Sequence, residues 1–282
     1  MPDRSATGKT ILITGCSSGI GRATARILAA RGHRVFAGAR RSEDVDALRA
    51  AGLEAVALDL DRTESIAAGL DAVLSRTGGA LDALFNNAAY GQPGAVEDLS
   101  REALREQFET NLFGTHELTR RVLAVMRAQG HGRIIQNSSL LGLVALSYRG
   151  AYNASKFALE GLTDTLRLEL AGTGIYVALI EPGPILSRFR EHAYEAFRRN
   201  IDAEASVHRE RYRAMAGRLM RAGAAMPFTL GPEAVAAKVI HALESRRPRV
   251  RYYVTVPTHL AAALRRCLPY RMLDRALRRM GG

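Results

Sequence analysis

The chain has 282 residues, of which 47% are hydrophobic, and a formal net charge of +12. This composition permits a large buried core and excludes wholesale disorder, and no apolar run approaches the roughly 18 residues of a transmembrane helix. Cys16 and Cys267 are the only cysteines and form neither a disulfide framework nor a metal-ligand spacing. Since a secretory signal is also lacking, we expect a soluble cytoplasmic protein with no metal site.

Arginine accounts for 37 of the 40 basic residues, so the strong positive charge needs an interpretation. The arginines are scattered through nearly every segment, and no known nucleic-acid motif accompanies them. We therefore expect no specific nucleic-acid binding.

Short strands alternate with helices from residue 10 to about residue 181. The strands are expected at 10–15, 33–40, 53–60, 81–89, 132–139 and 174–183, and the helices at 19–32, 43–51, 101–128 and 151–171. Apolar strands separated by helices of this length indicate βαβ units with right-handed crossovers. The pattern predicts an α/β fold, a doubly wound parallel sheet of the Rossmann type with helices on both faces.

The alternation stops at residues 187–226, which are helical in composition and contain nine arginines among aromatic and methionine residues. A helix at 232–245 and a strand near 251–256 restore it. We expect one domain over residues 1–257, followed by a basic amphipathic tail at 258–282 in which Pro269 separates two helical pieces. The tail could pack on its own domain or a partner subunit, lie on an anionic membrane as a peripheral contact, or be disordered.

Between the first strand and the first helix lies "TGCSSGIG", which contains three glycines. Glycines at such a turn let a pyrophosphate approach the backbone N–H groups of the helix N-terminus. A tight turn without a ligand is the alternative. We expect cofactor contacts from Gly15, Ser17, Ser18, Gly19, Ile20 and Gly21.

The end of the second strand bears on which dinucleotide binds. An acidic residue there would bind the ribose 2′-hydroxyl of NAD, but Ala39, Arg40 and Arg41 occupy these positions. A guanidinium matches the geometry of a phosphate. Arg40 and Arg41 therefore favour NADP(H) over NAD(H).

Further motifs follow in a fixed order: "NNAA" at 86–89, Asn111, Ser139, Tyr152 with Lys156, and "PGP" at 182–184. Ser139 precedes Tyr152 by thirteen residues. In these motifs the chain resembles the short-chain dehydrogenase/reductase family over about residues 9–185, and more loosely to 257. The stretch "NNAAYGQPGAVEDLS" and the basic tail most resemble the branch of hydroxysteroid and retinol dehydrogenases.

The expected chemistry centres on Tyr152, whose hydroxyl has an ordinary pKa near 10. Lys156, one helical turn later, and the positive nicotinamide ring of an oxidised cofactor both favour the tyrosinate. Ser139 can polarise the substrate oxygen by a hydrogen bond; Ser138 is the alternative, but the spacing selects Ser139. By resemblance, Asn111 holds a water that connects Lys156 to solvent.

The resemblance also implies the remaining cofactor contacts and the location of a lid. The contacts are Asp59, which faces the adenine amino group, together with Leu60, Asn87, Ala88, Tyr152, Lys156, Pro182, Gly183 and Ser187. Ala89 stands where the family usually has glycine, which would impose strain if that residue required a positive φ. Residues 187–226 correspond to the family's substrate lid.

Together these features predict an NADP(H)-dependent oxidoreductase that interconverts a ketone or aldehyde and an alcohol. We expect a bulky apolar substrate, although the lid arginines could instead attract a carboxylate or a thioester-linked acyl group. We also expect a homo-oligomer, a dimer or a tetramer. The rival interpretation is a catalytically inactive dinucleotide-binding sensor or scaffold on the same fold.

Overall fold

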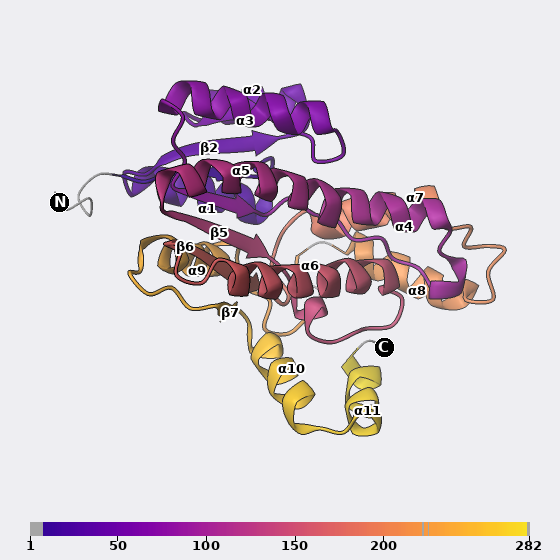
Figure 1. Ribbon diagram of the computed structural model, residues 1–282. Coiled ribbons are helices and arrows are strands. Elements are labelled where there is room, and N and C mark those ends of the chain that lie inside the picture. The colour runs from indigo at the N-terminus through magenta and orange to yellow at the C-terminus, as the bar shows by residue number, and fades with distance from the viewer. Residues whose placement is uncertain (1–7, 222, 225, 281–282) are drawn as a thin grey trace.

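The computed structural model in Figure 1 describes residues 8–221, 223–224 and 226–280, except for the side chains of Arg279 and Met280. The first seven residues of the expected domain, two residues of the expected lid and the last two of the tail lie outside the described residues.

A seven-stranded sheet forms the centre of the molecule, and all of its strand pairs are parallel. The strand order is β3-β2-β1-β4-β5-β6-β7, so the chain builds outward from β1 in one direction and then, from β4, in the other. This reversal confirms the predicted doubly wound sheet and creates a crevice at the carboxyl ends of β1 and β4. The strands are β1 (Thr10–Ile13), β2 (Arg34–Ala39), β3 (Glu54–Ala57), β4 (Ala83–Asn86), β5 (Gly132–Asn137), β6 (Ile175–Glu181) and β7 (Arg251–Tyr253).

Helices cover both faces of the sheet, because alternate side chains of each buried strand point to opposite faces. Ile11 and Ile13 of β1 share one apolar cluster with α1 (Gly19–Ala30), α2 (Ser42–Ala50) and α9 (Glu233–Glu244). Leu12 belongs to a second cluster, with α3 (Thr63–Thr77) and α5 (Thr115–Gln129). Helix α6 (Gly150–Glu169) packs on the same face, through Leu166.

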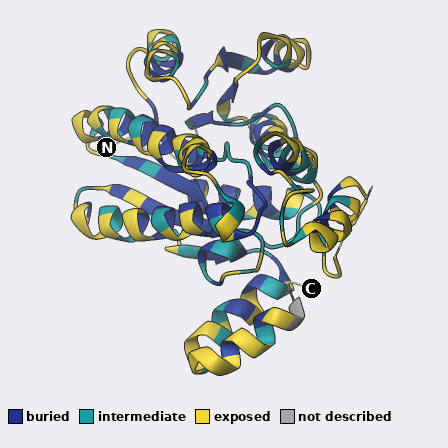
Figure 2. Cartoon of the chain, turned by 90° about the vertical axis from the view of Figure 1, so that its right-hand side faces the viewer, coloured by how far each residue is buried: buried dark blue, intermediate teal, exposed yellow. Residues whose placement is uncertain are grey.

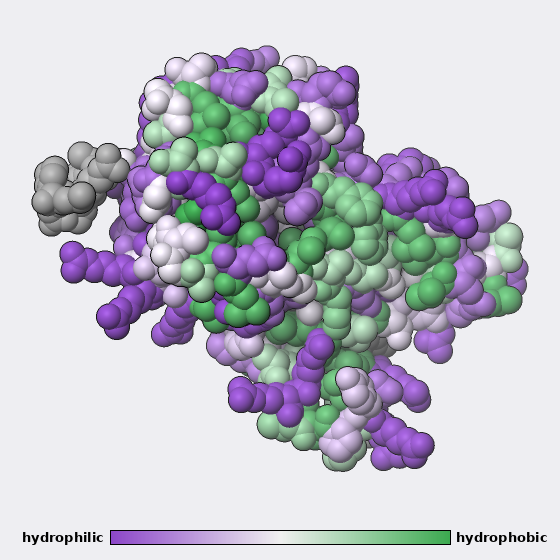
Figure 3. Space-filling model, in the orientation of Figure 1, coloured by the Kyte–Doolittle hydropathy of each residue, from purple (hydrophilic) through white to green (hydrophobic). Residues whose placement is uncertain are grey.

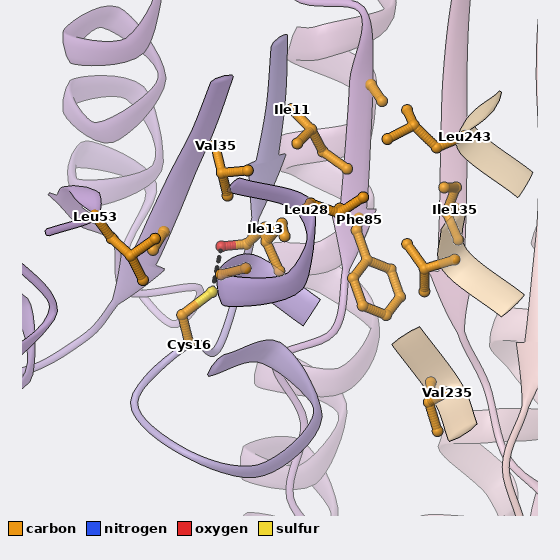
Figure 4. Packing of buried hydrophobic residues seen from close by; sticks show 14 of the residues in the cluster. Ile11, Ile13, Cys16, Leu28, Val35, Leu53, Phe85, Ile135, Val235 and Leu243 are labelled. Carbon is orange, nitrogen blue, oxygen red and sulfur yellow. Dashed lines mark hydrogen bonds between the residues drawn. The ribbon is translucent and has the colours of Figure 1, made fainter. Parts of the chain in front are cut away.

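Figure 4 shows the first of these clusters from close by, with Ile13 beside Cys16 at the start of the glycine loop and Phe85, Ile135 and Val235 to the right of it. The Cys16 thiol is fully buried there and donates a hydrogen bond to the Ile13 carbonyl oxygen (3.2 Å). Burial raises the pKa of this thiol well above its usual range, so Cys16 is an inert core residue.

Two helical predictions need correction. Helix α3 was not predicted, although Ile66, Leu70 and Val73 have the spacing of one helix face. The predicted helix 101–128 is instead α4 (Arg101–Phe108), a π-helical segment η3 (Glu109–Gly114) and then α5. At this break Gly114 lies against Leu60 in the segment that follows β3. A Cβ on Gly114 would come within 1.9 Å of the Leu60 carbonyl oxygen.

Two further pairs of helices lie in the second half of the chain. Helices α7 (Phe189–Asn200) and α8 (Arg209–Met220) build an apolar cluster around Phe197, Tyr212 and Met215. Helices α10 (Val256–Cys267) and α11 (Tyr270–Met280) form a hairpin that begins two residues before the expected tail and turns at Pro269, as predicted. Short 3-10 turns, η2 (Val96–Asp98) and η4 (Leu140–Gly142), lie in the loops that these pairs contact.

The hairpin packs on the residues that follow Ser139. Leu140 and Val144 share an apolar cluster with Ala261, Leu273 and Leu277, whereas Leu260 is 49% exposed. In Figure 2 the hairpin stands away from the sheet with exposed residues on its outer side. No helix of the described chain is long and apolar enough to cross a membrane.

Candidate active site

The glycine loop has the backbone geometry that a dinucleotide requires. Gly15 has a φ of 70°, and a Cβ on Gly21 would come within 2.3 Å of the Gly15 carbonyl oxygen. Ser18 is the N-cap of α1 but makes no side-chain capping bond, and the first turn holds no acidic residue. The Ser18 side chain thus does not cap the N–H groups at the start of α1, which fits a pyrophosphate at this end of the helix.

The other predicted cofactor contacts surround this loop. Ser187 lies beside Gly19, where a Cβ would come within 2.9 Å of the serine Cβ, and the Pro182 carbonyl oxygen accepts a bond from the Leu140 amide (2.8 Å). Residues 182–187 thus run from Leu140, the residue after Ser139, to the glycine loop. Gly183 belongs to this segment. Ser17 and Ile20 are half-buried in the loop itself.

Asp59 and Leu60 follow β3 at the same edge of the sheet. Asp59 is half-buried and its Oδ1 accepts a bond from the Asp61 amide (3.2 Å), while Leu60 is buried against Gly114. This places the Asp59 carboxylate at the strand end where the resemblance puts the adenine.

Arg40 and Arg41 differ in their partners. Arg41 donates from Nε to Asp44 Oδ2 (2.9 Å), so its charge is already compensated. Arg40 has a 66% exposed side chain and lies 3.9 Å from Asp61, a longer and weaker ion pair. A phosphate could therefore bind the guanidinium of Arg40 more readily than that of Arg41, because the pair with Asp61 is weaker than the pair with Asp44.

A chain of hydrogen bonds joins the glycine loop to Lys156. Asn87 donates from Nδ2 to the Thr14 carbonyl oxygen (2.9 Å), and Asn137 donates to Asn87 Oδ1 (2.9 Å). The Lys156 ammonium donates to the Asn137 carbonyl oxygen (2.7 Å). Thr14 Oγ1 also accepts from the amides of Asn87 and Ala88. The sequence analysis missed Thr14 and Asn137, whose only signal was their position at the ends of strands.

Three predicted catalytic side chains meet at the start of α6. The Ser139 hydroxyl lowers the pKa of Tyr152, and Lys156 Nζ lies 5.7 Å from the centre of the Tyr152 ring. Ser138, the alternative serine, is instead buried near Gly142 and Glu160.

Burial controls the protonation of this pair. It raises the pKa of Tyr152 to about 12, against the hydrogen bond from Ser139, which lowers it. It lowers the pKa of Lys156 to about 8, against the charge of Glu160, which raises it. Both shifts disfavour the charged form in a dry site, so the tyrosine is held as a proton donor.

Asn111 lies in the π-helical segment η3, not in a regular helix as expected. Its amide donates to the Tyr90 carbonyl oxygen (3.0 Å) and to Ser155 Oγ (3.1 Å), and its Oδ1 accepts from the Tyr90 amide (3.1 Å). The side chain therefore ties the loop after β4 to α6. The water that Asn111 is expected to hold remains a prediction, and single π-helical turns are frequent at functional sites.

Two residues near Tyr152 bear on access and strain. Phe189, the first residue of α7, stacks edge-on against the Tyr152 ring with 5.3 Å between ring centres, and Tyr152 is 8% exposed. The sequence analysis placed Phe189 in the lid without this role.

Ala89 does not have a positive φ, so the strain considered for it is absent. The described residues contain no cluster of His, Cys, Asp or Glu suited to a metal ion.

Comparisons with known proteins agree with this geometry. The model of the short chain dehydrogenase family matches residues 9–197. The uncharacterized oxidoreductase YbbO of Escherichia coli strain K12 is 42% identical over 269 residues, which are 95% of this chain and 94% of that protein. Human 17-beta-hydroxysteroid dehydrogenase type 1 is 34% identical, over 87% of this chain and 77% of its own. Human retinol dehydrogenase 8 is 38% identical, over 65% of this chain and 61% of its own.

Solved structures show the same fold. A short-chain dehydrogenase/reductase from Burkholderia phymatum in complex with NAD has a TM-score of 0.76 and 30% identity, over 98% of this chain and 97% of that one. A short-chain dehydrogenase from Burkholderia cenocepacia in complex with NADP has a TM-score of 0.73 and 23% identity, over 96% and 98%. With its motifs in the family's order and its sheet in the family's topology, this chain belongs to the short-chain dehydrogenase/reductase family, an oxidoreductase family that binds NAD(P).

Proposed function

We propose that this protein is an NADP(H)-dependent oxidoreductase that interconverts a ketone or aldehyde and an alcohol, with Tyr152 as the general acid and base. The observation that carries this proposal is the group of Ser139, Tyr152 and Lys156 at the carboxyl end of the sheet, hydrogen-bonded through Asn137 and Asn87 to the glycine loop. The rival interpretation, an inactive sensor, would not require these three side chains.

The residues divide the work of a carbonyl reduction. When bound, the nicotinamide supplies the hydride. Ser139 and Tyr152 would hydrogen-bond the carbonyl oxygen, and Tyr152 would give its proton to the oxygen as negative charge develops there. Lys156, as a cation, lowers the cost of the tyrosinate that remains. Its ammonium is held by the Asn137 carbonyl oxygen, which keeps the charge close to the ring.

The preference for NADP(H) is supported by the absence of an acidic residue at the end of β2. Ala39 is buried there, and the exposed Arg40 follows it. Arg40 is only weakly paired with Asp61, so it could bind a 2′-phosphate, whereas Arg41 would first have to leave Asp44. Among the structural relatives both NAD and NADP complexes occur, so this preference rests on Arg40.

A bulky substrate with an apolar body is supported by the surroundings of Tyr152. Phe189 covers the ring from the lid, and Leu140 and Val144 follow Ser139. Relatives named as steroid and retinol dehydrogenases are consistent with such a substrate.

We further propose that the protein is cytoplasmic and forms a homo-oligomer. Light scattering measures the mass of the oligomer.

The test is to monitor nicotinamide absorbance with steroid, retinoid, fatty and small carbonyl compounds, in both directions and with both cofactors. We expect turnover of an apolar carbonyl with NADPH. Tight cofactor binding without turnover of any compound in either direction would instead favour the sensor.

A further inference from the structure

The α10–α11 hairpin carries a positive charge that its own carboxylates do not balance. Residues 256–278 contain five arginines, at positions 265, 266, 271, 275 and 278, and a single acidic residue, Asp274. Among the described residues, no carboxylate lies within ion-pair distance of any of these arginines. In α8, by contrast, Glu204 and Glu210 both pair with Arg213. The charge of the hairpin is therefore available to an anionic partner.

Helix α10 has a narrow apolar face on the side away from the domain. Spacings of four, three and four residues place on this face Val256, Leu260, Ala263 and Cys267. All four are exposed, Val256 to 57% and Leu260 to 49%. On the other side of the helix Ala261 is buried against the domain. Arg266, also exposed, borders the apolar face.

Helix α11 places its arginines on the side away from the domain. Leu273 and Leu277, four residues apart, pack into the apolar cluster that joins the hairpin to the residues after Ser139. Arg271, Arg275 and Arg278 follow a helical spacing of four and three residues and are all exposed. The helix therefore has one apolar face against the domain and one basic face toward solvent.

The free end of the hairpin adds exposed apolar side chains. Tyr270, 84% exposed, and Met272, 52% exposed, lie at the start of α11, directly after the turn at Pro269. Figure 3 shows hydrophobic side chains at this lower end of the molecule, with strongly hydrophilic side chains on both sides of them. We call the apolar face of α10, the basic face of α11 and these two residues together the outer face of the hairpin.

The outer face is already formed in the folded protein. Arg265 donates to the Leu143 carbonyl oxygen and lies over the Phe157 ring, 5.0 Å from its centre, so α10 is tied to the domain. Figure 2 shows the hairpin away from the sheet with exposed residues on its outer side. A partner that binds there does not need to order the two helices, which reduces the entropic cost of binding.

A second copy of this chain fits the outer face poorly. In a two-fold dimer the same patch meets itself, so the arginines of both copies would come together. Only Asp274 of each copy would compensate them. An anionic lipid surface instead offers many negative headgroups above an apolar layer, which matches exposed arginines beside exposed apolar side chains.

We propose that the outer face of the hairpin docks the protein on an anionic lipid surface as a peripheral contact. The arginines bind the headgroups, while Leu260, Tyr270 and Met272 enter the interface. A tyrosine suits this depth, because its ring is apolar and its hydroxyl is polar. The proposal goes beyond the proposed reaction and does not depend on it.

The binding test measures flotation with vesicles of phosphatidylglycerol and phosphatidylcholine, and with vesicles of phosphatidylcholine alone. The wild type should float with the anionic vesicles only, and added salt should release it. Arg271→Gln/Arg275→Gln should lower the partition coefficient at least about tenfold, because two cations leave the lipid surface. Both side chains are exposed and make no ion pair within the described chain, so the melting temperature should not change.

The matched control is Arg101→Gln/Arg105→Gln on α4. It removes the same charge from two exposed positions with the same spacing, and it should bind vesicles nearly as the wild type does. Equal losses in the two double variants would overturn the proposal, because the net charge of +12 alone would then explain the binding. Equal flotation with neutral vesicles would overturn it as well.

A fluorescence test shows which part of the protein touches the lipid. The chain contains no tryptophan, so Tyr270→Trp creates a single reporter at the free end of the hairpin. Its emission should shift to shorter wavelength with the anionic vesicles, because the ring leaves water for the lipid interface. Tyr176→Trp, on an exposed position of β6, should not shift. No shift at position 270 in protein that floats would overturn the proposal.

A wild type that does not float with anionic vesicles would also overturn it. If Arg271→Gln/Arg275→Gln then changes the mass measured by light scattering, the outer face is an interface between copies of this chain instead.

Discussion

Two regions of this molecule meet at Tyr152 and are held together in different ways. Beneath the tyrosine, the strand ends are joined by hydrogen bonds among polar groups, from Thr14 through Asn87 and Asn137 to Lys156. Above it, the α7–α8 pair and the α10–α11 hairpin are held by leucines and aromatic rings in two separate apolar clusters.

In the reaction that we propose, this difference separates the chemistry from the selection of the substrate. A hydrogen-bonded network tolerates little change, because each lost partner leaves a buried polar group unsatisfied. An apolar cluster tolerates substitutions that conserve volume. We therefore expect changes in the hydrogen-bonded network to remove activity, and changes in the two apolar clusters to alter stability or the choice of substrate.

The largest effect should come from Tyr152→Phe, which removes the proton donor and keeps the ring. Turnover should fall by about 10²–10⁴-fold, the usual contribution of general acid–base catalysis, while fluorescence titration shows cofactor binding nearly unchanged. Lys156→Ala should impair both properties, because its ammonium is expected near the nicotinamide ribose. Tyr176→Phe, on an exposed position of β6, is the control. Near-normal turnover by Tyr152→Phe would refute its role.

The next effect tests the apolar hairpin. Leu273→Ala should lower the free energy of unfolding by about 2–3 kcal/mol, toward the lower end for a buried leucine because the site is near the surface. Leu260→Ala, 49% exposed on the same hairpin, should cost much less. Denaturant unfolding measures both. Equal losses would mean that the hairpin does not pack through Leu273.

A smaller effect is expected at the edge of the cofactor site. Arg40→Ala should weaken NADPH binding by about 1–3 kcal/mol, the scale of a lost charge-assisted hydrogen bond, and barely change NADH binding. Arg49→Ala, which removes an exposed arginine of α2 paired with Asp46, serves as the control. Comparable affinity of the wild type for NADH and NADPH would show that Arg40 does not read the phosphate.

The last effect is a change of stability with pH, and it should come from the buried carboxylates that Arg251 joins. Arg251 donates to Glu160, Glu181 and Asp164, three acids around one cation. Burial, and next the charge of Glu160, raise the pKa of Glu181 to about 8. Because the folded state holds this proton more tightly than the unfolded chain, stability should decline as the pH rises from about 4.5 to about 8.

Melting temperatures between pH 6 and pH 8.5 test this sign. Glu181→Gln should flatten the decline, since an amide does not titrate, whereas Glu169→Gln on the exposed side of α6 should leave it unchanged. A melting temperature that rises with pH over this range would contradict the raised pKa.

The sequence by itself determined the parts of the protein that depend on local spacing. The glycine loop needs only a strand, a turn and a helix N-terminus, and Tyr152 and Lys156 share a face because they are four residues apart on one helix. Alternating strands and helices likewise predicted the doubly wound sheet. These features require no knowledge of distant contacts.

The tertiary structure decided what covers the site. That Phe189 closes on Tyr152, that the hairpin packs on Leu140 and Val144, and that Asn111 lies in a π-helical turn all depend on contacts between distant segments. The arginines of α8 looked alike in the sequence, and only packing placed Arg211 and Arg218 beside the loop that enters α6, and Arg213 beside Glu204 and Glu210. Helical periodicity tells which residues share a face, but the partner of that face is set by the rest of the fold.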